Sequence, residues 1–270
     1  MRDLREDWDL FALRLAAATR VCVLSDFDGT LVPLGDDPNQ IRLPSVNRRV
    51  IESFRWTDRA VAGIVSGRSL DDLVARTSVE GIWYVGNHGF EIRTPAGVVT
   101  RHFEDKDVEY LTRIRDELTT ETGSIPGVLL EHKGPIVALH YRRVDPSRIR
   151  EVERAFCSVM ERHRQRLMVA HGNHLFEARL RGTRNKGTAV RLIRRELPSG
   201  SLVVYFGDDL TDRDAFRELQ GAGVSVEVGG SDSAIAHYTL PDPSAVWEVL
   251  QRILNSLGPQ PRKSDRSRRS

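Results

Sequence analysis

The sequence predicts a doubly wound α/β core, built on a parallel sheet, that is interrupted by an inserted α+β cap domain. Short, apolar, β-branched runs alternate with helical patterns near both ends of the chain, as is typical of a parallel sheet with helices on both faces. Between these parts the pattern changes to pairs of strands around turns. A chain of 270 residues is long enough for one large domain or two modest ones.

The first half of the core alternates helices and strands. Residues 7–19 show apolar side chains at helical spacing, and the run 21–25 is apolar on both faces, as expected of a central strand. The further elements predicted here are helices at 45–55 and 69–77 and strands at 60–65 and 81–85.

An antiparallel pattern then predicts the inserted domain. Its turns are centred on residues 95–97 and 133–135, each between two short strands. The predicted strands are 90–92, 98–102, 127–132, 136–142, 167–170 and 175–180, with helices at about 105–121 and 146–165.

The α/β pattern resumes at residue 185. The predicted elements are a helix at 185–196, a strand at 202–206, a helix from 212 and a strand at 223–228. We therefore expect a core of residues 1–92 and 183–257, an inserted cap of residues 93–182, and a disordered basic tail of residues 258–270.

The charge distribution argues against a nucleic-acid-binding protein. The tail holds five basic side chains and one acidic one, so its net +4 leaves −2 for the rest of a chain whose total is +2. Nucleic-acid-binding domains need a concentrated basic face, which this balance does not supply. For the tail, a weak tether to an anionic partner is the alternative to a solvated segment.

The sequence shows no sign of export or membrane insertion. No apolar run approaches the roughly 20 residues of a membrane span, and the first seven residues do not resemble a signal peptide. We interpret Cys22, in a predicted strand, and Cys157, in a predicted helix, as small buried apolar groups. We expect a cytoplasmic protein, a monomer, with no nucleic-acid or membrane partner.

Polar turns follow three of the predicted core strands. Asp26 and Asp28 come after the first strand, Ser66-Gly67-Arg68 after the second, and Gly207-Asp208-Asp209 after a later one. Ligands bind at the carboxyl ends of the strands in open parallel sheets, so we expect the three turns to share one pocket. A single Asp-x-Asp would indicate little, because acidic loop residues usually face solvent.

The spacing of Asp26 and Asp28 suits phosphoryl transfer. Residues two apart project to the same side of an extended backbone, so both carboxyl groups can face one centre. One can attack phosphorus and form an aspartyl phosphate, while the other protonates the leaving alcohol and then deprotonates water. Gly29 permits a tight turn near the phosphate, and we expect Thr30 to satisfy backbone groups of that turn.

A carboxylate that attacks a phosphate dianion is repelled, and one pair of unit charges about 4 Å apart is worth ~4 kcal/mol at an effective dielectric constant of about 20. The site must therefore supply cations. Asp208 and Asp26 can hold Mg²⁺, whose hard, octahedral coordination suits carboxylates, water and phosphate oxygens. Asp209 and Asp212 are either further ligands or residues that orient the others.

Basic and hydroxyl side chains are the candidates for phosphate binding. Lys186 stands just before a predicted helix and either brings a positive charge to the phosphoryl group or is an ordinary surface lysine. Ser66 offers a hydroxyl and a backbone N–H at a turn that leads into a helix N-terminus, which favours anions. Arg68 either contacts the substrate or pairs with a nearby acid, and the sequence leaves both open.

Four motifs in this order resemble those of the haloacid-dehalogenase-like (HAD) phosphatases: Asp26–Leu31, Ser66–Arg68, Asn185–Gly187 and Gly207–Asp212. The resemblance covers nearly the whole chain and implies a Rossmann-like core with a cap between the second and third motifs. The implied catalytic residues are Asp26 as nucleophile, Asp28 as acid and base, and Ser66 and Lys186 as phosphate binders. The implied Mg²⁺ ligands are Asp26, Asp28 through its carbonyl, and Asp208.

Within that superfamily the chain resembles the trehalose-6-phosphate phosphatases. The segments that carry this resemblance are Gly86–Glu91, Glu131–Lys133, His140–Arg142, Phe176-Glu177 and Asp212–Phe216. It departs from the family pattern at Arg213, where an acid is usual, and at Leu180, where a proline is usual. The resemblance implies Mg²⁺-dependent hydrolysis of trehalose 6-phosphate and a functional pairing with a trehalose-phosphate synthase.

The predicted cap residues suit a sugar. Its hydroxyls donate and accept hydrogen bonds, so carboxylates and ammonium groups bind them well. Glu131 and Lys133 share a strand face by their spacing, and Glu177 comes from another strand. From spacing alone, a surface ion pair is the alternative for Glu131 and Lys133. The predicted substrate-binding residues are Gly67, Arg68, His88, Glu91, Glu131, Lys133, Arg142 and Glu177.

Two other functions stay open at this point. A phosphatase for sucrose-, glucosylglycerate- or mannosylglycerate-type phosphates, or a sugar phosphomutase, would use the same nucleophile. The other is a non-catalytic sugar-phosphate sensor or a regulatory domain for a partner glycosyltransferase. Such a degenerate copy would be expected to lack an essential group, whereas the chain has Asp26, Asp28, Lys186 and Asp208.

Overall fold

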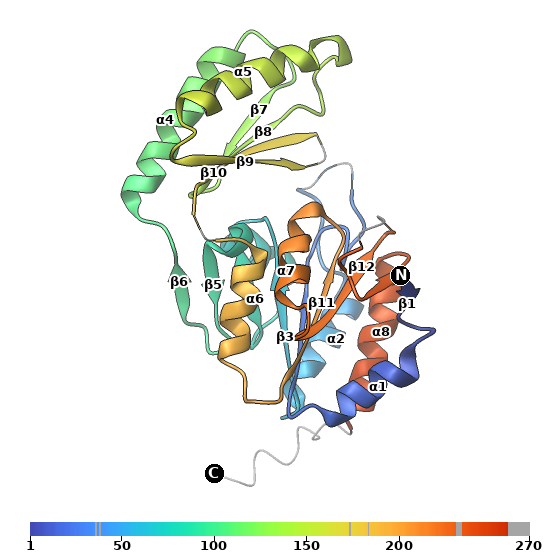
Figure 1. Cartoon of the computed structure of the whole chain (residues 1–270). Coiled ribbons are helices and arrows are strands. Elements are labelled where there is room, and N and C mark those ends of the chain that lie inside the picture. Colours follow the sequence, from blue (N-terminus) through green and yellow to red (C-terminus); the bar gives the residue numbers. More distant parts are fainter. Residues whose placement is uncertain (36, 38, 173, 183, 231–233, 259–270) are drawn as a thin grey trace. The chain divides into compact units, whose positions relative to one another are not determined.

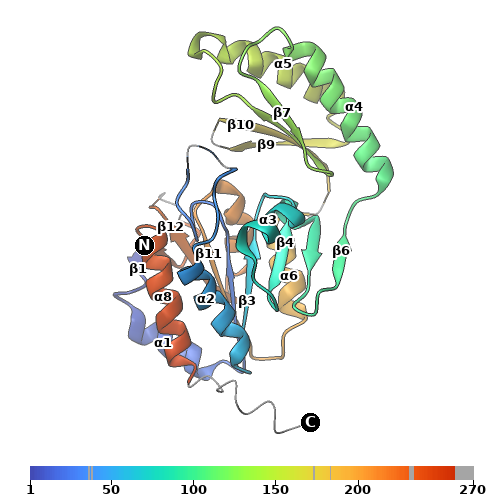
Figure 2. The same ribbon diagram turned by 180° about the vertical axis from the view of Figure 1, so that it is seen from behind.

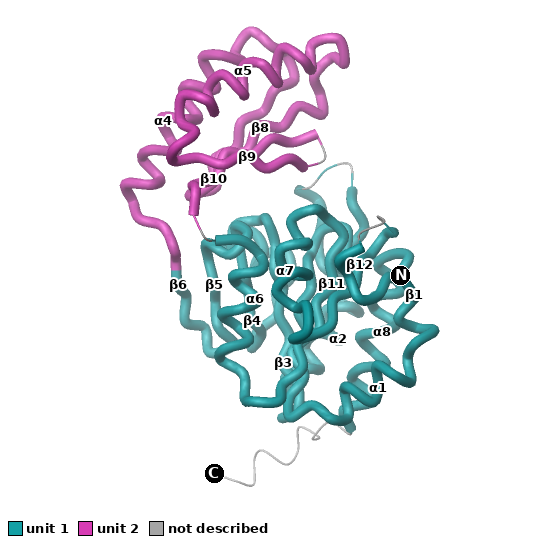
Figure 3. The backbone as a smooth tube through the Cα atoms, viewed as in Figure 1, with its two compact units in different colours: residues 1–100, 184–270 teal, residues 101–183 magenta. Residues whose placement is uncertain are grey.

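The computed structural model describes residues 1–35, 37, 39–172, 174–182, 184–230 and 234–258. The chain forms two compact units, coloured separately in Figure 3: unit 1 comprises residues 1–100 and 184–270, and unit 2 comprises residues 101–183. No helix in the described part of the chain is long and apolar enough to cross a membrane. The predicted basic tail lies, from residue 259 on, outside the described residues.

Unit 1 is built on a nine-stranded sheet of order β1-β13-β12-β11-β2-β3-β4-β5-β6. All neighbours from β1 to β4 in this order run parallel, and β5 runs antiparallel to β4. In the same order the strands are Arg2–Asp3, Tyr238–Leu240, Gly223–Val228, Leu202–Gly207, Val21–Ser25, Ala60–Val65, Trp83–Gly86, Glu91–Arg93 and Val99–Arg101. The predicted parallel sheet is confirmed.

Helices cover both faces of this sheet (Figures 1 and 2). One hydrophobic cluster includes side chains of α1 (Trp8–Ala17), α2 (Ser45–Ser53), α3 (Leu70–Thr77) and α8 (Pro243–Ser256), and another includes those of α6 (Lys186–Arg195) and α7 (Arg213–Glu218). Strand β2 contributes to both, because Val21 and Val23 join the first cluster while Cys22 and Leu24 join the second. A strand buried on both faces must be apolar throughout, as this one is.

The order of the strands reverses in the middle of the sheet. From β2 the chain proceeds outward through β3 and β4, whereas β11 starts a second series that proceeds the other way through β12 and β13. Strands β2 and β11 are therefore neighbours, with Val23 opposite Val204. Such a reversal leaves a crevice at the carboxyl ends of the two strands, where ligands bind in this class of fold.

Unit 2 is a four-stranded antiparallel sheet of order β7-β8-β10-β9 with two helices. The elements are α4 (Asp105–Thr122), β7 (Leu129–His132), β8 (Ile136–His140), α5 (Ile149–Arg162), β9 (Leu167–Gly172) and β10 (Leu175–Leu180). The helices pack on one face of the sheet around Leu118, Leu139 and Phe156. The opposite face carries Glu131, Ala138 and Glu177 side by side, one from each of β7, β8 and β10.

The structure differs from the sequence-based expectation in three respects. The hairpin arm β6 still belongs to the large sheet, so the units divide at residues 100/101 rather than at 92/93. Strands β1 and β13 and helix α8 were not predicted. Cys157 is exposed, contrary to prediction, because α5 turns Phe156 and Met160 toward the sheet and leaves Cys157 outside that stripe.

Two leucines on α1 test how the core of unit 1 is held. Leu15 is 1% exposed and Leu13 is 68% exposed. We expect Leu15→Ala to lower the free energy of unfolding by about 2–5 kcal/mol, because it removes buried methyl groups and leaves a cavity. The matched change Leu13→Ala should stay within about 0.5 kcal/mol of wild type. Urea denaturation measures both, and equal losses would show that α1 is not packed as described.

Candidate active site

The carboxyl ends of β2 and β11 bring two acidic turns together. Asp26 follows the last residue of β2, and Asp208 follows the last residue of β11. The backbone N–H of Asp26 donates to the carbonyl of Phe206 at 2.9 Å, so the pairing of the two strands continues to this residue. The predicted meeting of these turns at one edge of the sheet is thus observed.

A buried ammonium group lies between two carboxylates at this edge. Nζ of Lys186 is 2.8 Å from Oδ2 of Asp26 and 2.8 Å from Oδ1 of Asp212. Their side chains are 2%, 7% and 0% exposed, so Lys186 is not a surface lysine. Burial disfavours the charge of Lys186, but Asp212 and Asp26 outweigh it and raise its pKa, which keeps the ammonium group protonated.

Asp212 is fully engaged by protein groups. Its Oδ1 accepts from Lys186 and from the hydroxyl of Tyr205 at 2.6 Å, and its Oδ2 accepts from the backbone N–H of Asp209 at 3.0 Å. Asp212 therefore orients Lys186 and shapes the turn after β11. Sequence analysis missed Tyr205, although a tyrosine inside a buried apolar strand requires a partner for its hydroxyl.

Asp208 lies against the turn that follows Asp26. The Thr30 hydroxyl donates to Oδ1 of Asp208 at 2.6 Å. Thr30 therefore binds this carboxylate, whereas the sequence predicts that it satisfies backbone groups of its own turn. Gly29 has a φ of +83°, and a Cβ at this position would lie 2.0 Å from Oδ2 of Asp208. Only glycine allows the two turns to approach this closely.

The site holds more carboxyl groups than cationic side chains. Burial raises the pKa of Asp26 well above its usual range despite Lys186, and nearby Asp212 and Asp208 raise it further. Burial also raises the pKa of Asp208 to about 6, against the hydrogen bond from Thr30. Ligand oxygens of Asp26, Asp208 and Asp212 lie within 4.8 Å of one another. Such a crowded, partly desolvated oxygen set fits a hard divalent cation, whose charge would favour the ionised carboxylates.

Asp28 is held by an arginine. Nε and Nη2 of Arg68 donate to its two carboxylate oxygens, each at 2.7 Å, and Nη1 of Arg68 donates to Asp72 at 3.0 Å. Of the two possibilities left open for Arg68, the structure has the pairing with nearby acids.

The turn after β3 packs against the turn after β4. Ser66 is 1% exposed, and its carbonyl accepts from the N–H of His88. A Cβ on Gly67 would lie 2.5 Å from Nε2 of His88, so the two turns are in close contact. Oε2 of Glu91 accepts from the N–H of Leu70 and from Asn87, both at 2.9 Å, which binds the first turn of α3. Glu91 thus has a structural task whatever else it does.

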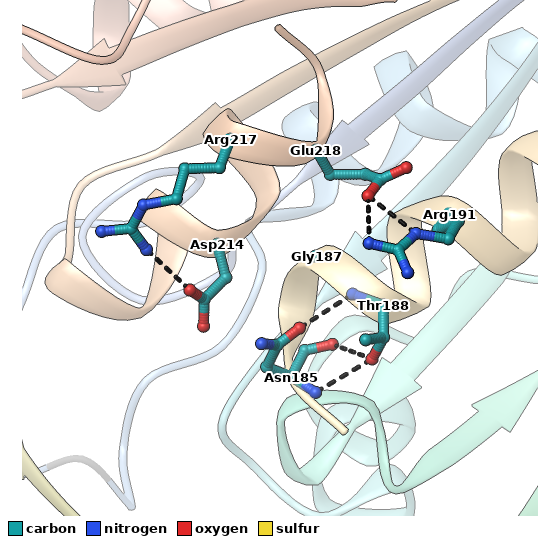
Figure 4. A pocket seen from close by; sticks show the side chains of 7 residues that line it. All are labelled: Asn185, Gly187, Thr188, Arg191, Asp214, Arg217 and Glu218. Carbon is teal, nitrogen blue, oxygen red and sulfur yellow. Dashed lines mark hydrogen bonds and ion pairs between the residues drawn. The ribbon is translucent and has the colours of Figure 1, made fainter. Parts of the chain in front are cut away.

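A hollow of about 260 Å³ lies beside the start of α6 (Figure 4). Asn185 caps the helix by accepting from the N–H of Thr188 at 2.8 Å, which fixes the position from which Lys186 extends. The charged side chains that line this hollow form ion pairs with each other: Arg191 with Glu218, and Arg217 with Asp214. The described residues that line the hollow include none of the carboxylates around Lys186.

Residues 24–244 match the family described as trehalose-phosphatase. The chain belongs to the trehalose-phosphatase family. Trehalose-phosphate phosphatase of Mycobacterium tuberculosis (strain ATCC 25618 / H37Rv) is 34% identical over 266 residues, which cover 93% of this chain and 66% of that protein. Trehalose-phosphate phosphatase of Mycobacterium avium (strain 104) is 35% identical over 256 residues, 89% and 64% respectively. The chain thus spans just under two thirds of the length of these relatives.

Several solved structures share the fold. The C-terminal domain of C. albicans trehalose-6-phosphate phosphatase has a TM-score of 0.79 at 22% identity, with 92% of this chain and 96% of that chain covered. Aspergillus fumigatus trehalose-6-phosphate phosphatase has a TM-score of 0.66 at 25% identity, with 91% of this chain and 96% of that chain covered. The C-terminal domain of a Candida albicans trehalose synthase regulatory protein also matches. Its TM-score is 0.68 at 12% identity, with 92% of this chain and 97% of that chain covered. The fold by itself therefore does not distinguish a phosphatase from a regulatory protein.

In this member of the trehalose-phosphatase family, four predicted substrate-binding residues belong to unit 2. Glu131 is paired with Lys133, and Oε2 of Glu131 lies 3.1 Å from both Nζ of Lys133 and Nε2 of His140. Glu177 is paired with Arg179, and both side chains are buried. Arg142 is exposed just after β8. Burial raises the pKa of Glu131, but His140 and Lys133 outweigh it and lower the pKa, which favours a carboxylate on this sheet face.

The remaining acidic candidate, Asp209, is exposed. Its Oδ1 accepts from the N–H of Leu210 at 2.6 Å, and its own N–H donates to Asp212. The structure therefore gathers Asp26, Asp208 and Asp212 around Lys186 and places the Asp209 carboxylate in the first turn of η4 (Leu210–Asp212).

Two glycines after β2 test the close approach to Asp208. We expect Gly29→Ala to lower the free energy of unfolding by more than about 1 kcal/mol, because alanine is strained at positive φ and its methyl group would displace Asp208 from Thr30. Gly35→Ala is the matched control, since its Cβ would make an ordinary contact with Ile41 at 3.5 Å. Chemical denaturation of both variants is the measurement, and an equal effect would contradict the described turn.

Proposed function

We propose that this chain hydrolyses trehalose 6-phosphate to trehalose and phosphate, with Mg²⁺ as cofactor and an aspartyl phosphate as intermediate. The observation that carries the proposal is the grouping of buried Asp26 and Lys186 with the partly buried Asp208 at the point where the strand order reverses. Membership of the trehalose-phosphatase family, and relatives named trehalose-phosphate phosphatase, support the substrate.

In the first proposed step an oxygen of Asp26 attacks phosphorus, and the bond between phosphorus and the sugar oxygen breaks. Asp28 gives its proton to that oxygen, so the sugar leaves as an alcohol. Lys186 neutralises charge on the phosphoryl group, and Ser66 supplies its hydroxyl at the end of the neighbouring strand. The backbone N–H of Ser66, also expected to bind phosphate, instead donates to the carbonyl of Val85 at 2.8 Å. Burial of Asp26 and Lys186 strengthens these electrostatic interactions, because little water screens them.

In the second step water attacks the phosphorus of the aspartyl phosphate and loses a proton to Asp28. The bond from phosphorus to Asp26 breaks, phosphate leaves, and both carboxyl groups return to their starting states. Arg68 orients the carboxyl group of Asp28, since the guanidinium donates to both of its oxygens.

Asp26 and Asp208 are the residues that would hold Mg²⁺, with the backbone carbonyl of Asp28. When bound, the ion would neutralise charge that develops on the phosphoryl oxygens. We assign Asp212 to the orientation of Lys186, because its oxygens already accept three hydrogen bonds. Asp209 is the weaker candidate ligand, since its side chain is exposed and bound to the N–H of Leu210.

Unit 2 supplies the proposed sugar selectivity. Glu131, Lys133 and Glu177 lie on or next to the sheet face that the helices do not cover, and they offer both hydrogen-bond acceptors and a donor. Substrate binding by Gly67, His88, Glu91 and Arg142 remains a prediction. A cytoplasmic setting, a monomeric state and a functional pairing with a trehalose-phosphate synthase are likewise predictions.

The proposed nucleophile and cofactor are tested together. Purified protein should release phosphate from trehalose 6-phosphate in the presence of Mg²⁺, lose this activity in EDTA, and recover it when Mg²⁺ is restored. Asp26→Asn should abolish turnover, because an amide does not form the aspartyl phosphate. Asp9→Asn, at an exposed position of α1, is the control and should keep full activity. Turnover by Asp26→Asn would rule out the covalent mechanism.

The sugar-binding role of unit 2 is tested by substrate. Glu131→Gln should reduce kcat/KM for trehalose 6-phosphate at least about tenfold, as expected for one charged hydrogen bond of about 1.5–3 kcal/mol. It should leave hydrolysis of p-nitrophenyl phosphate, which has no sugar, nearly unchanged. Glu161→Gln, 72% exposed on α5, is the matched control. A panel of sugar phosphates assayed in parallel would overturn the trehalose assignment if another substrate reacted faster.

A further inference from the structure

A line of ion pairs leads from Asp28 into helix α3. Arg68 contacts both oxygens of Asp28 and donates from Nη1 to Oδ2 of Asp72 at 3.0 Å. The same oxygen of Asp72 accepts from Nε of Arg76 at 2.6 Å. One carboxylate thus lies between two guanidinium groups, one of which holds Asp28.

The spacing of these residues explains the arrangement. Arg68, Asp72 and Arg76 are four residues apart, which places them along one face of α3 and the turn before it. Ser69 caps the helix and accepts from the N–H of Asp72 at 3.4 Å, so the start of the helix is fixed beneath Arg68. The three charged groups therefore meet without any long-range rearrangement.

The far end of the line is anchored in the fold. Arg76 is buried, and its Nη1 donates to the carbonyls of Asn39 and Ile41, each at 2.9 Å. Asp72 is thereby held from a direction away from Asp28. Since a guanidinium is a rigid planar fork, fixing its Nη1 on Asp72 also fixes Nε and Nη2, the two nitrogens that contact Asp28.

We propose that Asp72 is a positioning residue for the reaction: through Arg68 it holds the carboxyl group of Asp28 where the proton is transferred. The inference rests on the proposed function, because it assigns Asp72 to the acid and base of that mechanism. A purely structural role for Asp72 would affect the stability of α3 but would not discriminate between the two leaving groups compared below.

The choice of leaving group separates these roles. A sugar alkoxide leaves only if its oxygen receives a proton, whereas p-nitrophenolate leaves without one. A misplaced Asp28 must therefore slow formation of the aspartyl phosphate from trehalose 6-phosphate and spare its formation from p-nitrophenyl phosphate. Because water must still lose a proton in the second step, later turnovers should slow with both substrates.

The test is single-turnover and burst kinetics of Asp72→Asn with Mg²⁺ present. We expect the single-turnover rate with trehalose 6-phosphate to fall about tenfold or more, with KM within about twofold of wild type, since small misplacements of a catalytic group cost up to about 10²-fold. With p-nitrophenyl phosphate, the variant should release one equivalent of p-nitrophenol per enzyme at nearly the wild-type rate and then turn over slowly.

The matched control is Asp71→Asn. Asp71 is exposed in the same first turn of α3, so this variant removes the same charge from the same helix terminus. It should behave as wild type with both substrates. The p-nitrophenol burst also shows that the site of Asp72→Asn is folded.

Three results would overturn the inference. The first is equal rates for Asp72→Asn and Asp71→Asn. The second is an equal fall in the rate of the first step with both substrates. The third is a raised KM without a fall in kcat, which would indicate that Arg68 binds substrate. If wild-type protein itself hydrolysed neither compound, the proposed function would fail, which is a distinct outcome.

Discussion

The contact of Lys186 with Asp26 and Asp212 is the interaction on which the site depends. An ammonium group with 2% exposure is tolerated only where carboxylates compensate its lost hydration, and each partner comes from a different part of the core. Asp26 directly follows β2, Asp212 lies in the turn after β11, and Asn185 caps the start of α6. The sheet, the turn and the helix must all be in place before these charges can meet.

This arrangement is unfavourable for the stability of the core. One ammonium group faces Asp26 and Asp212 directly, with Asp208 close by, and burial raises the pKa of Asp26 and Asp208. A core designed only for stability would not gather several carboxylates in a desolvated crevice. The glycine at position 29, held at positive φ against Asp208, adds backbone that only glycine tolerates. Functional sites commonly hold such locally unfavourable features, which the surrounding structure supports.

Sequence analysis predicted the fold class and the strand ends well, because buried parallel strands leave a strong apolar pattern. The strands 21–25, 60–65, 175–180 and 223–228 were confirmed at those bounds. Short edge strands such as β1 and β13 leave no comparable pattern. The motifs located Asp26, Asp208 and Lys186, but the partners Tyr205, Thr30 and Asp72 could not be found, since their roles depend on tertiary proximity rather than on spacing. Arg68 was left between two roles for the same reason.

The neighbouring position of β2 and β11 also bears on the order of folding. Thr30 and Asp208 are 178 residues apart in sequence, so the crevice closes only after the chain up to Asp208 is available. Closing so long a loop carries an entropy cost that must be met before the site exists, and pairings of this kind form slowly. Unit 2, whose strands and helices all lie between residues 101 and 183, has no such requirement. During synthesis we therefore expect the insert to be structured first and the crevice between β2 and β11 to form last.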